Sequence, residues 1–437
     1  MTYVELFDKT SIENICAILT NVPTRVIFVG NSKKNIERRT QHYKKVFSKR
    51  GYNIEFISKA VSKWDIEQIV QALTEILNKY GDCEFGITGG DEAALVALGI
   101  LYERNRDKNI QIHRIGINNN KIYDCDKDGN TIEKEIPSLS VEENVRIYGG
   151  DVMYGEVMEE KTYRWNLTSE FCDDIRTMWS ICKVNTKKWN IQSRVFETIG
   201  EVGKTSADGL EVVASKDAIG EYYSKNEGRY SINNRILNDL RNPEKGGLIT
   251  GFEDTPTEVK ISYKDLQVKK CLTKAGLALE MIVYLTAKNL KDKAGKNIYD
   301  DVVNGVMIDW DGEIHERTPE TQEVQETQEV QEKHDTKNEI DILATHGMVP
   351  VFISCKNGKV TTEELYKLNT VAERFGGSYS KKVLVATNLP GEREENGEVI
   401  VNTDFRQRAE DMNIKILDKV QKMNDNQLAK VLNNLWK

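Results

Sequence analysis

Short apolar runs alternate with helical patterns through the first 150 residues, and this alternation restricts the fold more than any other feature. The runs TRVIFVG, YNIEFIS, CEFGITGG and IQIHRIGIN are short, apolar and rich in β-branched residues. Between two of them, residues 64–80 place their apolar side chains on one helical face. Strands and helices that alternate at this spacing form a parallel sheet covered on both faces. We therefore predict an α/β domain over residues 1–150.

The rest of the chain divides into two further parts. Helical patterns dominate residues 151–255, which we interpret as a helical connector. From residue 256 the signals are mixed again, with a long helical pattern over 264–290, several strand-like runs and a closing helix. We predict a second α/β domain over residues 256–437, interrupted by an acidic insertion at about 313–338.

That insertion accounts for most of the negative charge. Residues 313–339 contain nine acidic and three basic side chains, whereas the whole chain has a net charge of −8. The remainder is nearly neutral, so total charge neither favours nor excludes a nucleic-acid partner. The unit TQEVQE occurs twice over residues 321–332, which is typical of a solvated loop or an exposed helix.

Composition excludes several classes of protein. No apolar run approaches the length of a membrane span, and the N-terminus lacks the basic start and apolar core of a signal peptide. The seven cysteines have no C-x-x-C spacing, and the five histidines form no pair suited to metal binding or acid–base chemistry. We expect a cytoplasmic protein with no membrane partner, and histidines that are incidental to function.

The segment NEIDILATHGMVPVFISCKNG predicts two adjoining strands joined by a short turn. Glu339 and Asp341 are two residues apart, so on a strand their carboxylates face the same way. The second strand brings Ser354 and Lys356 to the same end of the sheet. Cys355, between them, points to the opposite face and is expected in the core.

These residue types suit metal-dependent hydrolysis of a phosphodiester. A divalent cation polarises the phosphoryl group and activates water, and Mg²⁺ or Mn²⁺ prefers hard oxygen ligands. A nearby lysine positions the nucleophile or offsets developing charge. Glu280 lies in the apolar helical stretch GLALEMIVYL, where a lone carboxylate is costly, so it is a second contributor. Asp309 is a weaker candidate. The alternative is a hairpin that carries charge for solubility alone.

The motifs ALEMIVY, EIDIL and FISCK together resemble the PD-(D/E)xK nuclease superfamily. More specifically, they resemble the restriction-endonuclease-like half of CRISPR ancillary nucleases that carry a CARF sensor domain. By this resemblance Asp341 matches the first acidic position and Lys356 the lysine, while Ser354 stands where the pattern has Asp or Glu. One metal ligand is thereby lost, and Glu339 and Glu280 are the substitutes for binding Mn²⁺ or Mg²⁺.

Two polar loops, VGNS and ITGGDEA, follow strands of the N-terminal sheet. Ligands of parallel sheets bind at this edge, over helix N-termini that favour anions. The first loop has one glycine, which argues against a dinucleotide-binding dehydrogenase. Together the loops resemble the CARF domain, a Rossmann-like sensor of cyclic oligoadenylates in type III CRISPR defence. The resemblance implies a homodimer with the ligand on its two-fold axis, contacted by Asn31, Ser32, Thr88, Gly89, Gly90, Asp91, Glu92 and Asn118.

The resemblance therefore implies a metal-dependent endonuclease that cleaves DNA and/or RNA in antiviral defence and is activated by cyclic tetra-adenylate. The main alternative is a CARF-type transcriptional regulator with an inactive nuclease-like domain, although residues 151–255 contain no basic helix-turn-helix pattern. A nucleotide-dependent metabolic enzyme would leave the charged hairpin unexplained. The first two hypotheses differ in whether Glu280, Asp341 and Lys356 converge in space.

Overall fold

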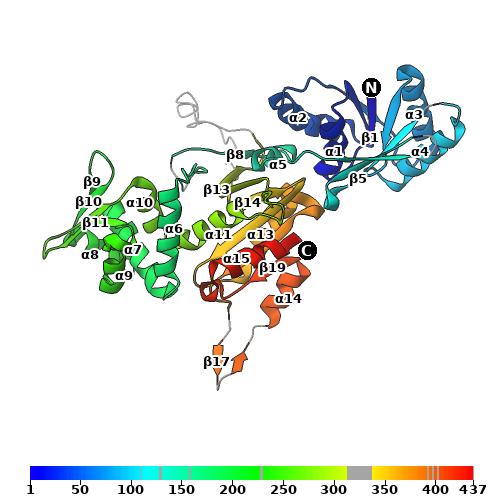
Figure 1. Ribbon diagram of the computed structural model, residues 1–437. Coiled ribbons are helices and arrows are strands. Elements are labelled where there is room, and N and C mark those ends of the chain that lie inside the picture. The colour runs from blue at the N-terminus through cyan, green and yellow to red at the C-terminus, as the bar shows by residue number, and fades with distance from the viewer. Residues whose placement is uncertain are drawn as a thin grey trace.

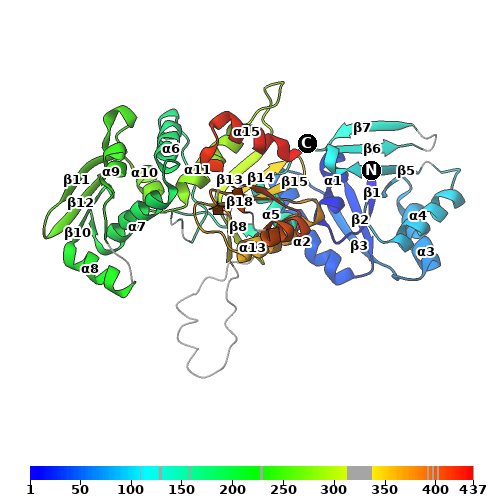
Figure 2. The same ribbon diagram turned by 90° about the horizontal axis from the view of Figure 1, so that it is seen from below.

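Three parts follow one another along an elongated molecule. The computed structural model describes residues 1–108, 110–126, 130–156, 158, 160–226, 230–312, 337–390, 393–395, 398–400 and 403–436. The N-terminal sheet lies at one end, the C-terminal sheet in the middle, and the segment that links them in sequence at the other end (Figure 1; Figure 2). The acidic repeat at 321–332 lies outside the described residues.

The N-terminal sheet has seven strands in the order β3-β2-β1-β4-β5-β6-β7. The first five in sequence are parallel and the last two antiparallel. The strands are β1 (Thr2–Leu6), β2 (Arg25–Gly30), β3 (Glu55–Ala60), β4 (Cys83–Gly86), β5 (Gln111–Gly116), β6 (Lys121–Cys125) and β7 (Thr131–Glu135). Helices α1 (Ser11–Asn21) and α2 (Lys33–Lys49) contribute to the core on one face, and α3 (Ile66–Tyr80) and α4 (Glu92–Arg104) to that on the other. The predicted parallel sheet is confirmed.

Strand β1 was not predicted, although it lies at the centre of this sheet. Its sequence, TYVEL, contains Glu5, which interrupts the apolar pattern. Glu5 is nevertheless buried, because its carboxylate lies 3.0 Å from the ring Nε2 of the buried His113. The ring Nδ1 lies 2.9 Å from Glu84, so His113 belongs to a buried ionic cluster inside the N-terminal domain.

The middle of the chain combines helices with a sheet. Its helices are α6 (Ser169–Cys182), α7 (Thr186–Val202), α8 (Lys216–Lys225) and α9 (Asn234–Arg241). An antiparallel sheet of order β11-β12-β10-β9 accompanies them, formed by β9 (Lys204–Thr205), β10 (Glu211–Ser215), β11 (Ile249–Asp254) and β12 (Glu258–Tyr263). The prediction of a helical connector over 151–255 missed this sheet, whose strands are short and partly exposed, and β12 lies beyond that boundary.

The C-terminal sheet has the order β19-β16-β15-β14-β13-β8. Its strands are β8 (Asp151–Val152), β13 (Asp301–Asp309), β14 (Lys337–His346), β15 (Val349–Lys356), β16 (Lys381–Ala386) and β19 (Ile414–Leu417). A core on one face includes residues of α5 (Val141–Ile147), α13 (Thr362–Gly376) and α14 (Thr403–Asp411). A core on the other face includes residues of α11 (Leu277–Asn289) and α15 (Asp425–Asn433). A small pair, β17 (Arg393–Glu395) and β18 (Glu398–Ile400), stands apart.

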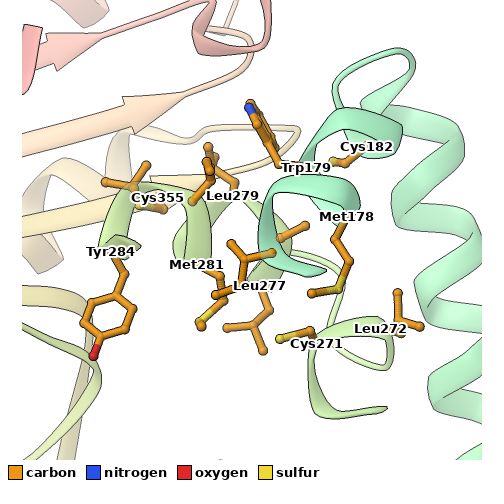
Figure 3. Packing of buried hydrophobic residues seen from close by; sticks show 14 of the residues in the cluster. Met178, Trp179, Cys182, Cys271, Leu272, Leu277, Leu279, Met281, Tyr284 and Cys355 are labelled. Atoms are coloured by element: carbon orange, nitrogen blue, oxygen red, sulfur yellow. The ribbon is translucent and has the colours of Figure 1, made fainter. Parts of the chain in front are cut away.

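The long helix expected over 264–290 is two helices, α10 (Leu266–Leu272) and α11, separated at residues 273–276. Gly276 is the residue before α11 and supplies no side-chain cap. Helix α11 packs between α6 and the C-terminal sheet, as Figure 3 shows for Met178, Trp179 and Cys182 beside Leu277, Leu279 and Met281. Cys355 of β15 lies in this core, as predicted. One continuous apolar core therefore joins the middle segment to the C-terminal sheet.

The turn of the β14–β15 hairpin packs into the N-terminal domain. Met348 and Val349 are buried in the apolar core that contains residues of α1 and α2. The Gly347 carbonyl accepts a hydrogen bond of 3.1 Å from the Leu139 amide. The turn of the hairpin therefore lies in the N-terminal core, whereas Asp341 and Lys356 lie toward the other end of its two strands. Among the described residues, no helix has the length and apolar character required for a membrane span.

Candidate functional site

The β14–β15 ladder stops where the acidic residues begin. Its last backbone pair is Ile342 with Ile353. One position beyond, the Asp341 carboxylate accepts hydrogen bonds from the Cys355 amide at 2.5 Å and the Ser354 hydroxyl at 3.2 Å. The side chain thus connects two strands whose backbones no longer pair. This arrangement fixes the carboxylate at the open end of the hairpin.

Lys356 lies beside Asp341 and beside a residue that the sequence did not single out. Its Nζ is 3.9 Å from Asp341 and 3.0 Å from Glu364, in the first turn of α13. Burial lowers the pKa of Lys356, but the charges of Asp341 and Glu364 outweigh it and the net pKa is raised. Lys356 is therefore a fixed ammonium group, suited to a phosphate oxygen.

Glu280 joins this group from α11 and is almost fully buried, with 6% of its surface exposed. Burial, followed by the charge of Asp341, raises the pKa of Glu280 to about 8, although Lys274 and Lys356 act in the opposite direction. Burial also raises the pKa of Asp341, against the effects of Lys356 and of the Cys355 amide. Asp341 and Lys356 are thus 3.9 Å apart, and the charges of both act on the buried Glu280.

Glu339 lies at the rim of the site and is half-exposed. Its carboxylate forms an ion pair of 2.9 Å with Lys274, in the turn between α10 and α11. Lys274 and Glu364 were both missed by sequence reasoning, because each comes from a separate element and is brought close only by tertiary packing. Asp309 lies outside the cluster. In the β13–β14 register its backbone is opposite Lys337, which is four residues from Asp341 along β14.

The oxygen donors fit one hard divalent cation that retains several waters. Mg²⁺ is usually bound through one or two carboxylates, and Glu280 and Asp341 are two carboxylates whose ionised forms such a cation would favour. Glu339 is engaged by Lys274, and Ser354 contributes no charge. Within the described part of the chain, no three His, Cys, Asp or Glu side chains are arranged to hold a metal ion. The residues therefore fit a two-carboxylate site and not a three-ligand cage.

A second site lies at the carboxyl ends of β1, β2 and β4, where a cavity of about 570 Å³ opens. Five of the eight predicted ligand residues line it: Asn31, Ser32, Gly90, Asp91 and Glu92. Four cations also line it, and the sequence analysis did not assign them: Lys9, Arg38, Arg39 and Lys63. Lys9 lies in the loop after β1. Because that strand was not predicted, its loop was not recognised as part of the site. Asp8, Asp91 and Glu92 line it as well, so the four cations exceed the carboxylates by one.

The predicted residues of this loop region have distinct roles. Ser32 and Asp91 cap α2 and α4, accepting hydrogen bonds from the amides of Asn35 at 3.4 Å and Ala94 at 2.9 Å. The Thr88 hydroxyl accepts a 2.7 Å hydrogen bond from the Ile115 amide, so it links β4 to β5. Thr88, Gly89 and Asn118 do not line the cavity.

Asn118 lines an adjacent cavity of about 1090 Å³ between the N-terminal and C-terminal domains. Lys9 and Arg39 line both cavities, and Arg374 and Lys381 of the C-terminal domain line the larger one. The cavity of the N-terminal domain therefore shares lining residues with the cavity at the boundary between the two domains.

The paired glycines are required by a close approach to β1. A Cβ atom on Gly89 would lie 2.6 Å from the Leu6 carbonyl oxygen, and one on Gly90 would lie 2.6 Å from the Leu6 Cβ. Gly90 also has a φ of +88°, which side chains rarely adopt. The glycines therefore set the path of the loop, and only Gly90 lines the cavity.

Comparisons with known proteins locate this arrangement among solved structures. No protein-family model matches the chain, and neither does any curated protein. The crystal structure of protein VC1899 from Vibrio cholerae matches with a TM-score of 0.66 at 16% identity, covering 100% of this chain and 97% of that one. Can2 from Sulfobacillus thermosulfidooxidans, in complex with cyclic tetra-adenylate, matches with a TM-score of 0.63 at 15% identity, covering 100% and 99%. This chain shares its fold with both proteins.

At these identities the likeness establishes the fold along the whole chain, and the prediction of two α/β domains is confirmed. A type III CRISPR defence DNA nuclease activated by cyclic oligoadenylate gives a TM-score of 0.43 at 14% identity, covering 91% of this chain and 47% of that one. Within this fold, the cavity lined by Lys9, Arg38, Arg39 and Lys63 belongs to the N-terminal domain, and Asp341 and Lys356 belong to the C-terminal domain.

Proposed function

We propose that this protein is a metal-dependent endonuclease controlled by a cyclic oligoadenylate, with cyclic tetra-adenylate as the activator, in type III CRISPR defence. The observation that carries the proposal is the approach of Asp341 and Lys356 to 3.9 Å at the end of the β14–β15 hairpin, beside the buried carboxyl of Glu280 on α11. The fold that it shares with Can2, which was solved with cyclic tetra-adenylate, supports the choice of activator.

Each residue of the cluster has a distinct role in this proposal. A bound Mg²⁺ or Mn²⁺ would polarise the phosphoryl group and lower the pKa of the attacking water. Asp341, held by the Ser354 hydroxyl and the Cys355 amide, presents its carboxylate in one orientation. Glu280 supplies the second carboxylate from α11. Lys356, restrained by Glu364, offsets the negative charge that develops on the phosphate.

The cavity of the N-terminal domain is proposed as the activator site. Its four lysine and arginine side chains and the N-termini of α2 and α4 favour phosphate groups. We propose that the active form is a homodimer in which the activator contacts both subunits. Light scattering of the purified protein, with and without cyclic tetra-adenylate, measures the oligomeric state.

The function is tested by incubating the full chain with supercoiled plasmid and with labelled single-stranded DNA or RNA. Each reaction contains Mg²⁺ or Mn²⁺, with or without cyclic tetra-adenylate. Cleavage that requires both the metal and the activator, and disappears in Asp341→Ala and Lys356→Ala, supports the proposal. Absence of cleavage by a protein that binds the activator in calorimetry refutes it and favours the regulator.

A further inference from the structure

A groove lies between α7 and the loops that follow β15 and β16, with a volume of about 810 Å³. We name it the α7 groove and define it by Lys187, Ile191, Arg194, Tyr223, Lys359 and Leu389. Helix α7 belongs to the middle segment, whereas Lys359 and Leu389 belong to the C-terminal domain. The groove therefore lies at the boundary of these two parts, next to the proposed catalytic cluster.

The charge of the α7 groove is positive. Lys187, Arg194 and Lys359 are exposed, and no carboxylate is among the lining residues. None of these three cations forms an ion pair with another residue that the structure describes. Three unpaired cations, with no carboxylate among the lining residues, give the groove a net positive charge. They favour a polyanion over a neutral or acidic protein surface.

The groove is held at a fixed distance from Lys356. Lys359 follows Lys356 by three residues, so the Cα atoms of these two lysines are at most about 11 Å apart. The intervening Asn357 is buried, and its amide donates hydrogen bonds to the Asn190 side-chain oxygen at 2.8 Å and to the Cys182 sulfur at 3.3 Å. The Asn190 amide donates in return to the Asn357 carbonyl. Helix α7 is thus hydrogen-bonded directly to Asn357, the residue that follows β15 and Lys356.

The remaining lining is mixed: Thr186, Asn190 and Asn388 are polar, whereas Ile191, Tyr223, Val360, Leu389 and Pro390 supply apolar surface that includes one aromatic ring. Ile191 has 48% of its surface exposed, which is high for a large aliphatic side chain on a helix. Tyr223 and Leu389 line the same space. A duplex keeps its bases stacked and paired, so it presents mainly phosphates to such a surface. An unpaired strand presents phosphates to the cations and bases to the apolar side chains.

We propose that the α7 groove binds an unpaired strand of the nucleic-acid substrate beside the phosphate that is cleaved. Lys187, Arg194 and Lys359 contact the phosphates of the strand, and Tyr223 and Ile191 contact a base. This inference rests on the proposed nuclease function and names the substrate class, which is single-stranded DNA or RNA or a locally opened duplex.

The test measures binding without cleavage, using full-length protein that carries Asp341→Asn. Fluorescence anisotropy compares labelled 12-nucleotide single-stranded DNA, the same sequence as RNA, and a blunt DNA duplex, each with cyclic tetra-adenylate and Mg²⁺. We expect the single strands to bind more tightly than the duplex. Adding Lys187→Ala, Arg194→Ala and Lys359→Ala together should weaken single-strand binding at least tenfold. The slope of log Kd against log salt should fall by about 2, since each lost phosphate contact contributes about 0.7.

Two matched variants complete the design. Ile191→Asp places a charge on the exposed face of α7 and should weaken single-strand binding by a similar factor. Lys44→Ala removes an exposed lysine from α2, outside the groove, and should leave the affinity within twofold. Unchanged affinity in the triple variant, or tighter binding of the duplex than of the single strands, overturns this inference alone. Failure of the parent protein to bind any nucleic acid overturns the proposed function as well.

Discussion

Asp341 receives two hydrogen bonds from β15 and lies within 3.9 Å of the Lys356 ammonium. The backbone amide of Cys355 gives the shorter hydrogen bond, so the Ser354 hydroxyl is the weaker of the two supports. We expect Asp341→Asn to lower kcat at least 100-fold, because it removes the negative charge. Ser354→Ala should cost less than tenfold, because the Cys355 amide still holds the carboxylate. Initial rates of cleavage of a labelled strand measure both, and equal losses would contradict this assignment.

His113 stabilises the N-terminal domain in a way that depends on pH. Burial lowers its pKa, but the negative charges of Glu5 and Glu84, both within 3.0 Å of the ring, outweigh this and raise the pKa to about 10. The folded-state pKa exceeds the value of about 6.5 in the unfolded chain, so the stabilisation is complete below pH 6.5 and is lost as pH rises toward 10. His113→Gln leaves two buried carboxylates without a cation and should cost about 3–5 kcal/mol.

Urea unfolding at pH 6.5, 8 and 9.5 measures this effect. The difference in the free energy of unfolding between the wild type and His113→Gln should shrink as pH rises. A difference that stays constant across this range would show that His113 is neutral in the folded protein.

At the scale of elements, the loop after β4 depends on its glycines. Gly89→Ala places a Cβ 2.6 Å from the Leu6 carbonyl oxygen, so we expect it to destabilise the protein by about 1–3 kcal/mol and to weaken activator binding. Gly99 in α4 has nothing within 4 Å of an added Cβ and is the matched control. Gly99→Ala should stabilise by about 0.5–1 kcal/mol. Thermal unfolding and calorimetry with cyclic tetra-adenylate measure both, and similar behaviour of the two variants would refute the steric argument.

Most of the elements that were predicted have a clear pattern. β2 to β5 and β15 are short runs rich in apolar residues, and α3 has a regular apolar face, so each was found near its observed bounds. β14 was found from the apolar residues beside its two carboxylates. β1 was missed because Glu5 breaks its pattern, although a buried histidine partner makes that residue acceptable. Asp341 and Lys356 belong to a short motif, whereas Glu364 and Lys274 belong to none. Their contacts arise only when α13 and the α10–α11 turn pack around the hairpin.

At the scale of the molecule, the β14–β15 turn connects the two proposed sites. Met348 is 1% exposed within the N-terminal core. We expect Met348→Ala to reduce the ratio of activated to basal cleavage several-fold, because the cavity that it leaves loosens the turn, and to destabilise the protein by about 2–5 kcal/mol. Met348→Leu should preserve the ratio, since the volume is nearly conserved.

Ile15→Ala separates coupling from stability. Ile15 is fully buried in the same core but lies on α1, outside the hairpin. It should lower stability by a similar amount and leave the ratio of activated to basal cleavage unchanged, at a temperature where all variants are folded. If both alanine variants reduce the ratio equally, the turn has no special part in coupling.

The length of the hairpin also determines how far its turn must rotate to displace the Asp341 carboxylate. Asp341 lies six residues from Gly347, a span of about 20 Å along an extended strand. A stiff arm of that length, pivoting by about 3° at the turn, carries the carboxylate through about 1 Å, and a misplacement of this size can cost about 100-fold in rate. A ligand that slightly reorients the N-terminal core could therefore turn catalysis on or off without any large swing of one domain against another.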